Sequence, residues 1–372
     1  MATKYTRQKD GRFQAKVWTG TYTKTGAKKY ISIYSTKSSK DLKRKVNLFK
    51  QELDAGMSAI STDMTFYDYA LSWLNTYKKV RERGTQIMYE NIINTHLFTL
   101  SCVHLSDIRR THLQLVINNN IEKARTCQQI YVTFKQIIKS AISDKLLPVT
   151  ALDNICGNIE LPKYVAKEKR GLTDIEKDAL KKADFSPREK AFVYIAYGCG
   201  LRRGEILALT IFDISLERNE LTVNKALAFD GNNPYIKGTK SVNGNRIVPI
   251  PPFLNEFISE YIKILPGTNL FYSANNEYMT ASAYNKMWSN IVSKMNVAAG
   301  GSNKIKIITG LTVHIFRHNY CANLCYQMPN ISIKRIAQLS GDSEKMVLEV
   351  YNHVLEPVSY THLRAHETSA HL

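Results

Sequence analysis

Six residues in the second half of the chain have side chains suited to phosphoryl transfer: Arg202, Lys240, His314, Arg317, Asp342 and Tyr351. A guanidinium is always protonated, and its planar donors match two phosphate oxygens. Two arginines can therefore hold a phosphodiester and stabilise the charge that grows during in-line attack. A phenol, with an ordinary pKa of about 10, becomes a good nucleophile once a base or nearby cations favour the phenolate. The set predicts a site where a tyrosine hydroxyl attacks a phosphodiester.

Arg202 belongs to the segment Gly-Leu-Arg-Arg-Gly-Glu at 200–205, which follows an apolar helical run that weakens at Gly198. The glycines predict that Arg202 lies at a junction between a helix and a turn. The adjacent Arg203 is its rival, and Arg202 is preferred because it directly follows Gly-Leu. Glu205 favours a helix N-terminus and is also spaced to orient Arg202.

Lys240 stands in a polar turn that leads into a short alternating strand, Arg246 to Ile250, with Pro249 near its end. A turn followed by this alternation predicts a β-hairpin. Lys237 is close by and is the rival of Lys240.

The other candidates lie on predicted helices. Thr312 is a plausible N-cap, and a separation of three places His314 and Arg317 on one helical face. Gly341 breaks the next helix, and a second short helix carries Tyr351. This pattern predicts that the second helix delivers the phenol to the site.

The order GLRxxE, TK followed by RxVP, HxxR, and then a glycine turn with YxH resembles the tyrosine recombinase (phage integrase) family, including phage and conjugative-transposon integrases. The resemblance implies that Tyr351 is the nucleophile and forms a 3′-phosphotyrosine. It also implies that Arg202, Arg317 and His314 surround the scissile phosphate and that Lys240 protonates the leaving 5′ oxygen. Because a phosphotyrosine keeps the energy of the broken bond, no nucleotide or other cofactor is expected, and the chain has no GxxxxGK[ST] loop.

Asp342 departs from the family pattern, which usually has histidine or tryptophan at this position. A carboxylate repels a phosphate unless it is protonated or paired with an arginine. One outcome is slow catalysis. Our hypothesis is the other outcome, in which Asp342 accepts a bond from Tyr351 or a neighbouring arginine and acts as a positioning residue.

The charge of the chain indicates a polyanionic partner. The formal net charge is +19 with a pI of about 9.5. Residues 1–60 hold 14 lysines and arginines against four acidic residues, more than half of the excess. Alternation at 12–18 and 29–34 and helical periodicity at 40–53 predict a three-stranded sheet with one helix. Residues 1–56 thus resemble the arm-type DNA-binding domain of integrases.

The predicted fold class is mainly α with small β-sheets (α+β), arranged as several domains because 372 residues exceed the usual single-domain size. A helical core-binding domain is expected at 62–160, opened by a capping box at Thr65. A basic linker is expected at 161–171, and a catalytic domain with a small antiparallel sheet at 172–357. Residues 358–372 look like a translated sequencing adapter and are expected not to be native, which removes Tyr360 as a rival nucleophile.

The resemblance implies a site-specific recombinase that integrates or excises a mobile element as a homotetramer on double-stranded DNA with core and arm sites. Whether an excisionase or a host DNA-bending protein sets the direction is left open. Two alternatives remain: a catalytically impaired DNA-binding relative, and a topoisomerase-like nicking and rejoining enzyme. The six cysteines show no zinc pattern and predict buried reduced thiols. The sequence shows no signal peptide or membrane span, so a cytoplasmic protein and no metal are expected.

Overall fold

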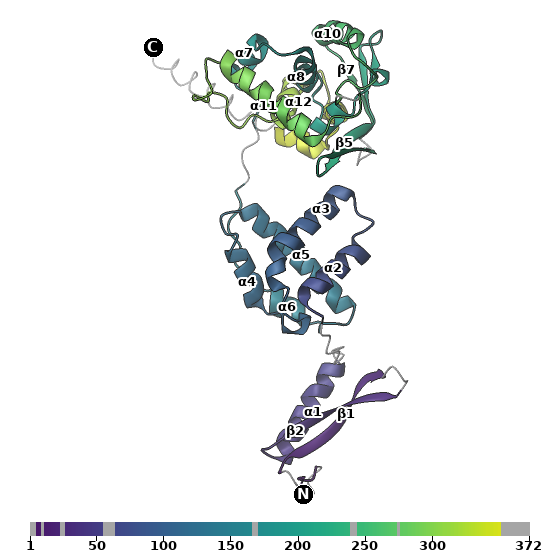
Figure 1. Ribbon diagram of the computed structural model, residues 1–372, viewed down its shortest axis with the longest axis vertical. Helices are drawn as coiled ribbons and strands as arrows, with labels where there is room; N and C mark the ends of the chain where they lie inside the picture. The colour runs from purple at the N-terminus through teal and green to yellow at the C-terminus, as the bar shows by residue number, and fades with distance from the viewer. Residues whose placement is uncertain are drawn as a thin grey trace. The chain divides into compact units, whose positions relative to one another are not determined.

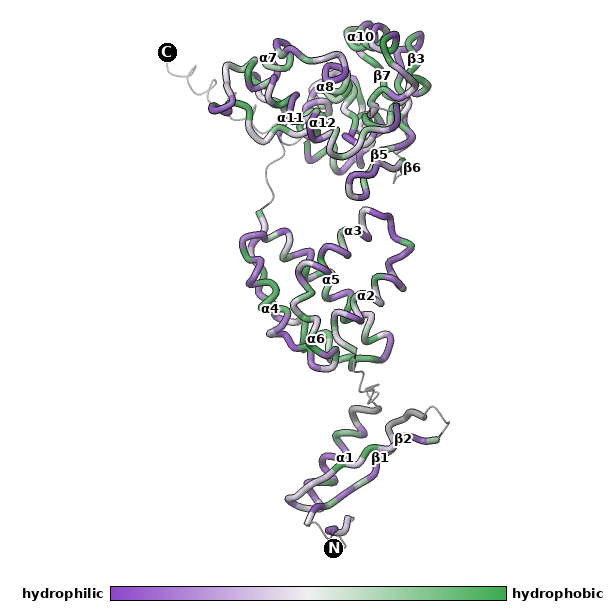
Figure 2. Tube along the Cα trace, viewed as in Figure 1, coloured by the Kyte–Doolittle hydropathy of each residue, from purple (hydrophilic) through white to green (hydrophobic). Residues whose placement is uncertain are grey.

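The computed structural model describes residues 5–8, 11–22, 27–54, 64–165, 170–238, 244–273 and 276–350. The chain divides into two compact units, Met1–Ala166 and Lys167–Leu372. Both are rich in helices, with small antiparallel sheets (Figure 1), which confirms the predicted fold class. Hydropathy alternates along most helices (Figure 2), as expected for elements that bury one face.

The N-terminal part of the first unit is a two-stranded hairpin covered by a helix: β1 (Phe13–Tyr22), β2 (Lys28–Ser35) and α1 (Ser39–Asp54). Ala15 and Val17 alternate along β1 and pack on Leu42 and Val46 of the helix. Three strands are predicted from the sequence, but the described residues contain two. In the described segment before β1, Arg7 makes an isolated antiparallel bridge to Phe13.

The rest of the first unit is helical. Thr65 caps α2 by accepting a hydrogen bond from the backbone N–H of Asp68, as the capping-box pattern predicts. Phe66 then stacks on Phe134 in the core with ring centroids 4.7 Å apart. The α-helices are α2 (Phe66–Tyr77), α3 (Arg83–Asn91), α4 (Arg110–Asn118), α5 (Ala124–Ser143) and α6 (Ala151–Cys156). A π-helix, Ile92–Leu97, and two 3-10 turns, Phe98–Leu100 and Leu105–Asp107, connect α3 to α4.

The second unit surrounds helix α8 with helices and a small sheet. Its α-helices are α7 (Asp174–Lys182), α8 (Pro187–Cys199), α9 (Arg203–Leu207), α10 (Pro252–Lys263), α11 (Ala281–Ala298), α12 (Val313–Cys325) and α13 (Ile333–Ser340). A 3-10 turn, Ile211–Asp213, precedes the sheet. One antiparallel sheet has the order β3 (Ile214–Ser215), β4 (Glu220–Val223), β7 (Arg246–Pro249), and β5 (Lys225–Asp230) pairs with β6 (Asn233–Gly238) as a hairpin.

Helix α8 is buried and has well-defined ends. Ser186 caps it in a reciprocal capping box with Glu189. It ends at Gly200, whose φ of +61° is left-handed. A Cβ there would lie 2.2 Å from the Tyr320 ring of α12, so only glycine allows the two helices to approach. This turn places Arg202 beside α12.

The cysteines are reduced, but one prediction about them is wrong. Cys102 is exposed, because it lies in the turn after the 3-10 helix at 98–100. The other five are buried as predicted: Cys127, Cys156, Cys199, Cys321 and Cys325.

Candidate active site

Three of the predicted site residues meet in the second unit. Arg202 is the N-cap residue of α9, Arg317 lies on α12, and Asp342 follows the glycine that ends α13. The Asp342 carboxylate accepts a hydrogen bond from each arginine: Oδ1 from Nη2 of Arg202 at 2.6 Å and Oδ2 from Nη2 of Arg317 at 2.7 Å. Two guanidiniums that would otherwise repel each other are therefore held by one anion.

The C-terminal end of α13 binds three arginines through consecutive carbonyl groups. The Leu339 carbonyl accepts from Arg246, the Ser340 carbonyl from Arg317, and the Gly341 carbonyl from Arg202. Carbonyls at a helix C-terminus lack intrahelical partners and carry partial negative charge, so guanidiniums are well suited to satisfy them. The end of α13 thus fixes the positions of both candidate arginines.

Glu205 connects the cluster from the opposite side. Its Oε1 accepts from Nη1 of Arg202 at 2.9 Å, and its two oxygens accept from Nη1 and Nη2 of Arg246 at 3.2 and 2.8 Å. Burial by itself raises the pKa of this carboxyl, but the hydrogen bonds and charge of Arg246, with smaller contributions from Arg202 and Arg317, outweigh burial and lower the pKa to about 2. Glu205 is therefore ionised at every pH at which the protein would be used.

The two candidate arginines differ in exposure. The Arg317 side chain is 2% exposed and the Arg202 side chain 42%. Burial lowers the pKa of Arg317 from its ordinary value, and the charge of Asp342 opposes this effect. Arg317 also donates to the Gly200 carbonyl at 2.9 Å, which ties α12 to the turn before Arg202.

His314 lies one turn before Arg317 on α12 but is exposed. Its ring lies edge-on to His318, with centroids 4.4 Å apart. Thr312 occupies the N-cap position of α12, as predicted, but its side chain makes no capping hydrogen bond. The rival Arg203 lies over the rings of Phe229 and Tyr284, at 5.8 and 5.2 Å from their centroids.

Lys240 and Tyr351 lie outside the described residues. The described chain ends its β5–β6 hairpin at Gly238, two positions before Lys240 in sequence. Residues 344–350 are helical up to the position before Tyr351. The roles of both residues therefore stay predictions, as does the sequencing-adapter origin of residues 358–372, which are also outside the described residues.

Arg246 is a site residue that sequence reasoning missed. Its context in RxVP predicts only the start of a strand, yet its side chain is 4% exposed and contacts Glu205 and the end of α13. The sequence does hold a signal for this role. Arg246 begins a strand, and Val248, the next residue on the same face of that strand, is apolar. Such a charge is buried only when it is paired.

The phage integrase family model matches residues 173–357, which contain every residue of this cluster. The chain belongs to the tyrosine recombinase family. It is 23% identical over 356 residues to the tyrosine recombinase XerC-like protein of Caldanaerobacter subterraneus subsp. tengcongensis, covering 86% of this chain and 87% of that one. It is also 23% identical over 362 residues to the integrase of Staphylococcus phage L54a, covering 82% and 94%. The recombinase is thus an enzyme that breaks and rejoins DNA, as predicted.

Solved structures of other integrases share this fold. The Tn1549 transposon integrase in complex with a circular intermediate DNA superposes with a TM-score of 0.64 at 19% identity, covering 78% of the recombinase and 95% of that chain. A lambda integrase dimer bound to a core site gives 0.57 at 17% identity, covering 94% and 95%. Within the described part of the recombinase, no helix is long and apolar enough to span a bilayer, and no group of three or more His, Cys, Asp or Glu could hold a metal ion.

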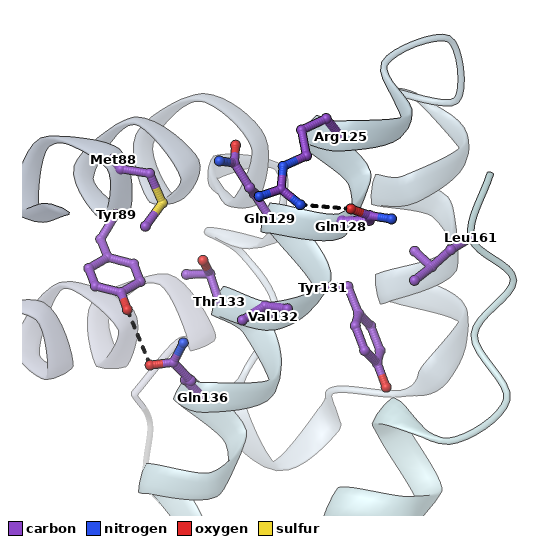
Figure 3. A pocket seen from close by; sticks show the side chains of 10 residues that line it. All are labelled: Met88, Tyr89, Arg125, Gln128, Gln129, Tyr131, Val132, Thr133, Gln136 and Leu161. Atoms are coloured by element: carbon purple, nitrogen blue, oxygen red, sulfur yellow. Dashed lines mark hydrogen bonds between the residues drawn. The ribbon is translucent and has the colours of Figure 1, made fainter. Parts of the chain in front are cut away.

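The helical part of the first unit has a separate groove, lined by both apolar and polar side chains. Its volume is about 410 Å³, and α5 supplies most of its wall (Figure 3). Arg125 donates to Gln128 at 3.0 Å, and Tyr89 donates to Gln136 at 3.3 Å. Guanidinium and amide groups are the side chains that hydrogen-bond base edges in the major groove. The groove is lined by Met88, Tyr89, Arg125, Gln128, Gln129, Tyr131, Val132, Thr133, Gln136 and Leu161.

Proposed function

We propose that the recombinase integrates or excises a mobile element through a covalent 3′-phosphotyrosine formed by Tyr351. The Tyr351 hydroxyl gives its proton to solvent, the phenolate oxygen attacks the scissile phosphorus, and the bond from phosphorus to the 5′ oxygen breaks. Lys240 gives a proton to that oxygen. Rejoining reverses these steps with a DNA hydroxyl as the attacking group. The observation that carries the proposal is the pair of arginines, Arg202 and Arg317, held by one carboxylate at hydrogen-bond distance from both.

Arg202 and Arg317 bind the scissile phosphate in this proposal, and His314 adds a donor from the exposed face of α12. Asp342 positions the arginines. Its two oxygens each accept from a different guanidinium, so the carboxylate sets the distance between them. The Asp342 carboxylate is paired with both arginines. Its negative charge is therefore compatible with a site that binds a phosphate.

DNA is the proposed partner of both units. The basic residues 1–56 would contact arm sites, the groove along α5 would face the core site, and residues 172–357 would carry out cleavage. The lambda integrase tetramer bound to a Holliday junction, which shares the fold with a TM-score of 0.58, supports a homotetramer as the assembled form. We propose the segments 62–160 and 161–171 as the core-binding domain and the linker.

A second candidate is a DNA-binding relative that has lost turnover. It is favoured by the carboxylate of Asp342, which neutralises charge that the phosphate would otherwise receive. In this case the chain would bind DNA tightly and leave it uncut.

A suicide substrate distinguishes the two. It is built from the DNA that flanks the reading frame, with a nick near the cut site so that the freed fragment diffuses away. We expect a protein–DNA adduct on a denaturing gel that Tyr351→Phe abolishes and that the matched control Tyr326→Phe, at an exposed tyrosine of the same unit, leaves intact. Tight binding without an adduct would favour the impaired relative. A tenfold faster cleavage by Asp342→His would contradict the positioning role.

A further inference from the structure

Arg246 begins strand β7, and its buried guanidinium joins two parts of the site that are distant in sequence. It donates to both oxygens of Glu205, 41 residues earlier, and its Nε donates to the Leu339 carbonyl at 3.0 Å, 93 residues later. A further contact reaches the Gly244 carbonyl at 3.4 Å. Through these contacts Arg246 connects the start of α9 to the end of α13.

The approach of Arg246 to α13 depends on Gly341. A Cβ at that position would lie 2.7 Å from Nη1 of Arg246, and the φ of +66° is left-handed. Glycine therefore lets the guanidinium lie directly against the turn whose next residue is Asp342.

The charges of the cluster show why the arrangement needs Arg246. Arg202, Arg246 and Arg317 are positive and Glu205 and Asp342 are negative, which leaves one positive charge, equal and opposite to that of one phosphodiester. Without Arg246 the five-residue cluster would become a neutral set of four. Glu205 would then have Arg202 as its one remaining salt-bridge partner among the described residues, and its pull on that guanidinium would increase.

We propose that Arg246 is a positioning residue for strand cleavage: it engages Glu205 and the Leu339 carbonyl, so that Arg202 and the α13 turn keep the alignment that phosphate binding requires. The inference rests on the proposed function of Arg202 and Arg317. Arg246 itself is too buried to touch DNA, so its loss should slow cleavage and leave DNA affinity nearly unchanged.

The pH profile of cleavage distinguishes a positioning role for Arg246 from a purely structural ion pair. Glu205 is faced by Arg202, Arg246 and Arg317, and Arg246 makes the largest of the contributions that lower the pKa of Glu205. With Arg246 removed, burial still raises that pKa and fewer groups oppose it, so Glu205 should take up a proton at a higher pH than it does in the wild type. Cleavage by the variant should then decline toward acid pH, because protonated Glu205 orients Arg202 less well.

The test uses the full chain and single-turnover cleavage of the suicide substrate at saturating DNA. We expect Arg246→Met to lower the cleavage rate constant about a hundredfold, the effect of misplacing a catalytic group by about 1 Å. The dissociation constant for the same DNA should change by less than about threefold, since a surface charge is not lost. Arg218→Met is the matched control, because Arg218 is 76% exposed beside the same sheet and should leave the rate constant unchanged.

Removing a buried guanidinium can prevent folding, so two further variants keep the test decisive. Arg246→Lys retains the charge but cannot bind Glu205 and Leu339 together, and we expect it to recover less than a tenth of the lost rate. Arg246→Met combined with Glu205→Gln removes the buried carboxylate that would lose a partner, so this variant should fold, yet cleave slowly.

Wild-type cleavage rates in the folded double variant, or in Arg246→Met at all pH values, would overturn the inference. Failure of the wild-type protein to form a Tyr351-dependent adduct would instead overturn the proposed function.

Discussion

Replacing Asp342 by asparagine tests whether this carboxylate holds the two candidate arginines together. Asparagine has nearly the same shape but no charge, and one of its two terminal atoms becomes a donor. At most one of the hydrogen bonds from Arg202 and Arg317 can persist, so two guanidiniums face each other without their shared anion. The folded state should lose stability, even though no side-chain volume is removed.

The magnitude follows from the geometry. A hydrogen bond to a charged group contributes about 1.5–3 kcal/mol. The variant loses one such bond and gains repulsion between Arg202 and Arg317. The Asp342 side chain is 26% exposed, so solvent screens part of this effect and the cost is smaller than it would be for a fully buried group. We expect a loss of about 2–3 kcal/mol. For a unit of roughly 200 residues this corresponds to a fall in Tm of about 5–10 °C.

The assay is thermal unfolding of the full chain, followed by circular dichroism, with and without sulfate. Sulfate can bind the exposed Arg202 guanidinium, which loses the charge of Asp342 in the variant, and it binds only the folded state, so it should raise the Tm of the Asp342→Asn variant more than that of the wild type. Glu260→Gln is the matched control, because Glu260 pairs with Lys263 but is 69% exposed. Its Tm should change by less than about 1 °C.

Two results would refute the reasoning. A Tm of the Asp342→Asn variant within about 1 °C of the wild type would show that the carboxylate does not hold the arginines. An equal rise in Tm with sulfate for both proteins would show that the anion binds elsewhere.

Two other predictions concern the same cluster. Because the pKa of Glu205 is lowered to about 2, its stabilising effect is fully present above the ordinary glutamate pKa and is lost as the pH falls through 2. The difference in unfolding free energy between wild type and Glu205→Gln should therefore shrink by about 3 kcal/mol between pH 5 and pH 2 in urea titrations, and a constant difference would contradict it. Gly341→Ala should lose about 3 kcal/mol, since a Cβ meets Arg246 at a left-handed φ. Gly231→Ala, at a φ of +59° with no atom within 4 Å, should lose only about 1 kcal/mol, and equal losses would refute the clash.

Local sequence was sufficient to predict the elements around Arg202 and Asp342 because each lies where a helix begins or has just ended. Gly200 and Gly341 both take a left-handed φ, as a glycine after a helix often does. These two turns bring Arg202 and Asp342 beside Arg317 of α12. The sequence also predicted that Asp342 would accept from Tyr351 or a neighbouring arginine, and the structure shows two such arginines.

The rest of the site depends on contacts between distant segments, which have no periodicity in the sequence. The pairing of Arg246 with Glu205 and Leu339 arises when a sheet strand packs on α9 and α13. The exposure of His314 likewise follows from which face of α12 packs on α8. Spacing alone placed His314 and Arg317 on one face, but a separation of three still spans enough of the helix for one residue to be buried and the other exposed.

The difference in exposure between the two arginines bears on how a phosphate would reach them. Arg202 is accessible, whereas Arg317 is covered by Asp342 and by the Ser340 and Gly200 carbonyls that accept its hydrogen bonds. A phosphate can therefore contact Arg202 in this conformation, but contact with Arg317 requires the turn at 340–342 to shift. That turn leads within nine residues to Tyr351. In the proposed function, the turn that covers Arg317 must therefore move before a phosphate can contact both arginines, and the bond from Arg246 to the Leu339 carbonyl opposes that movement.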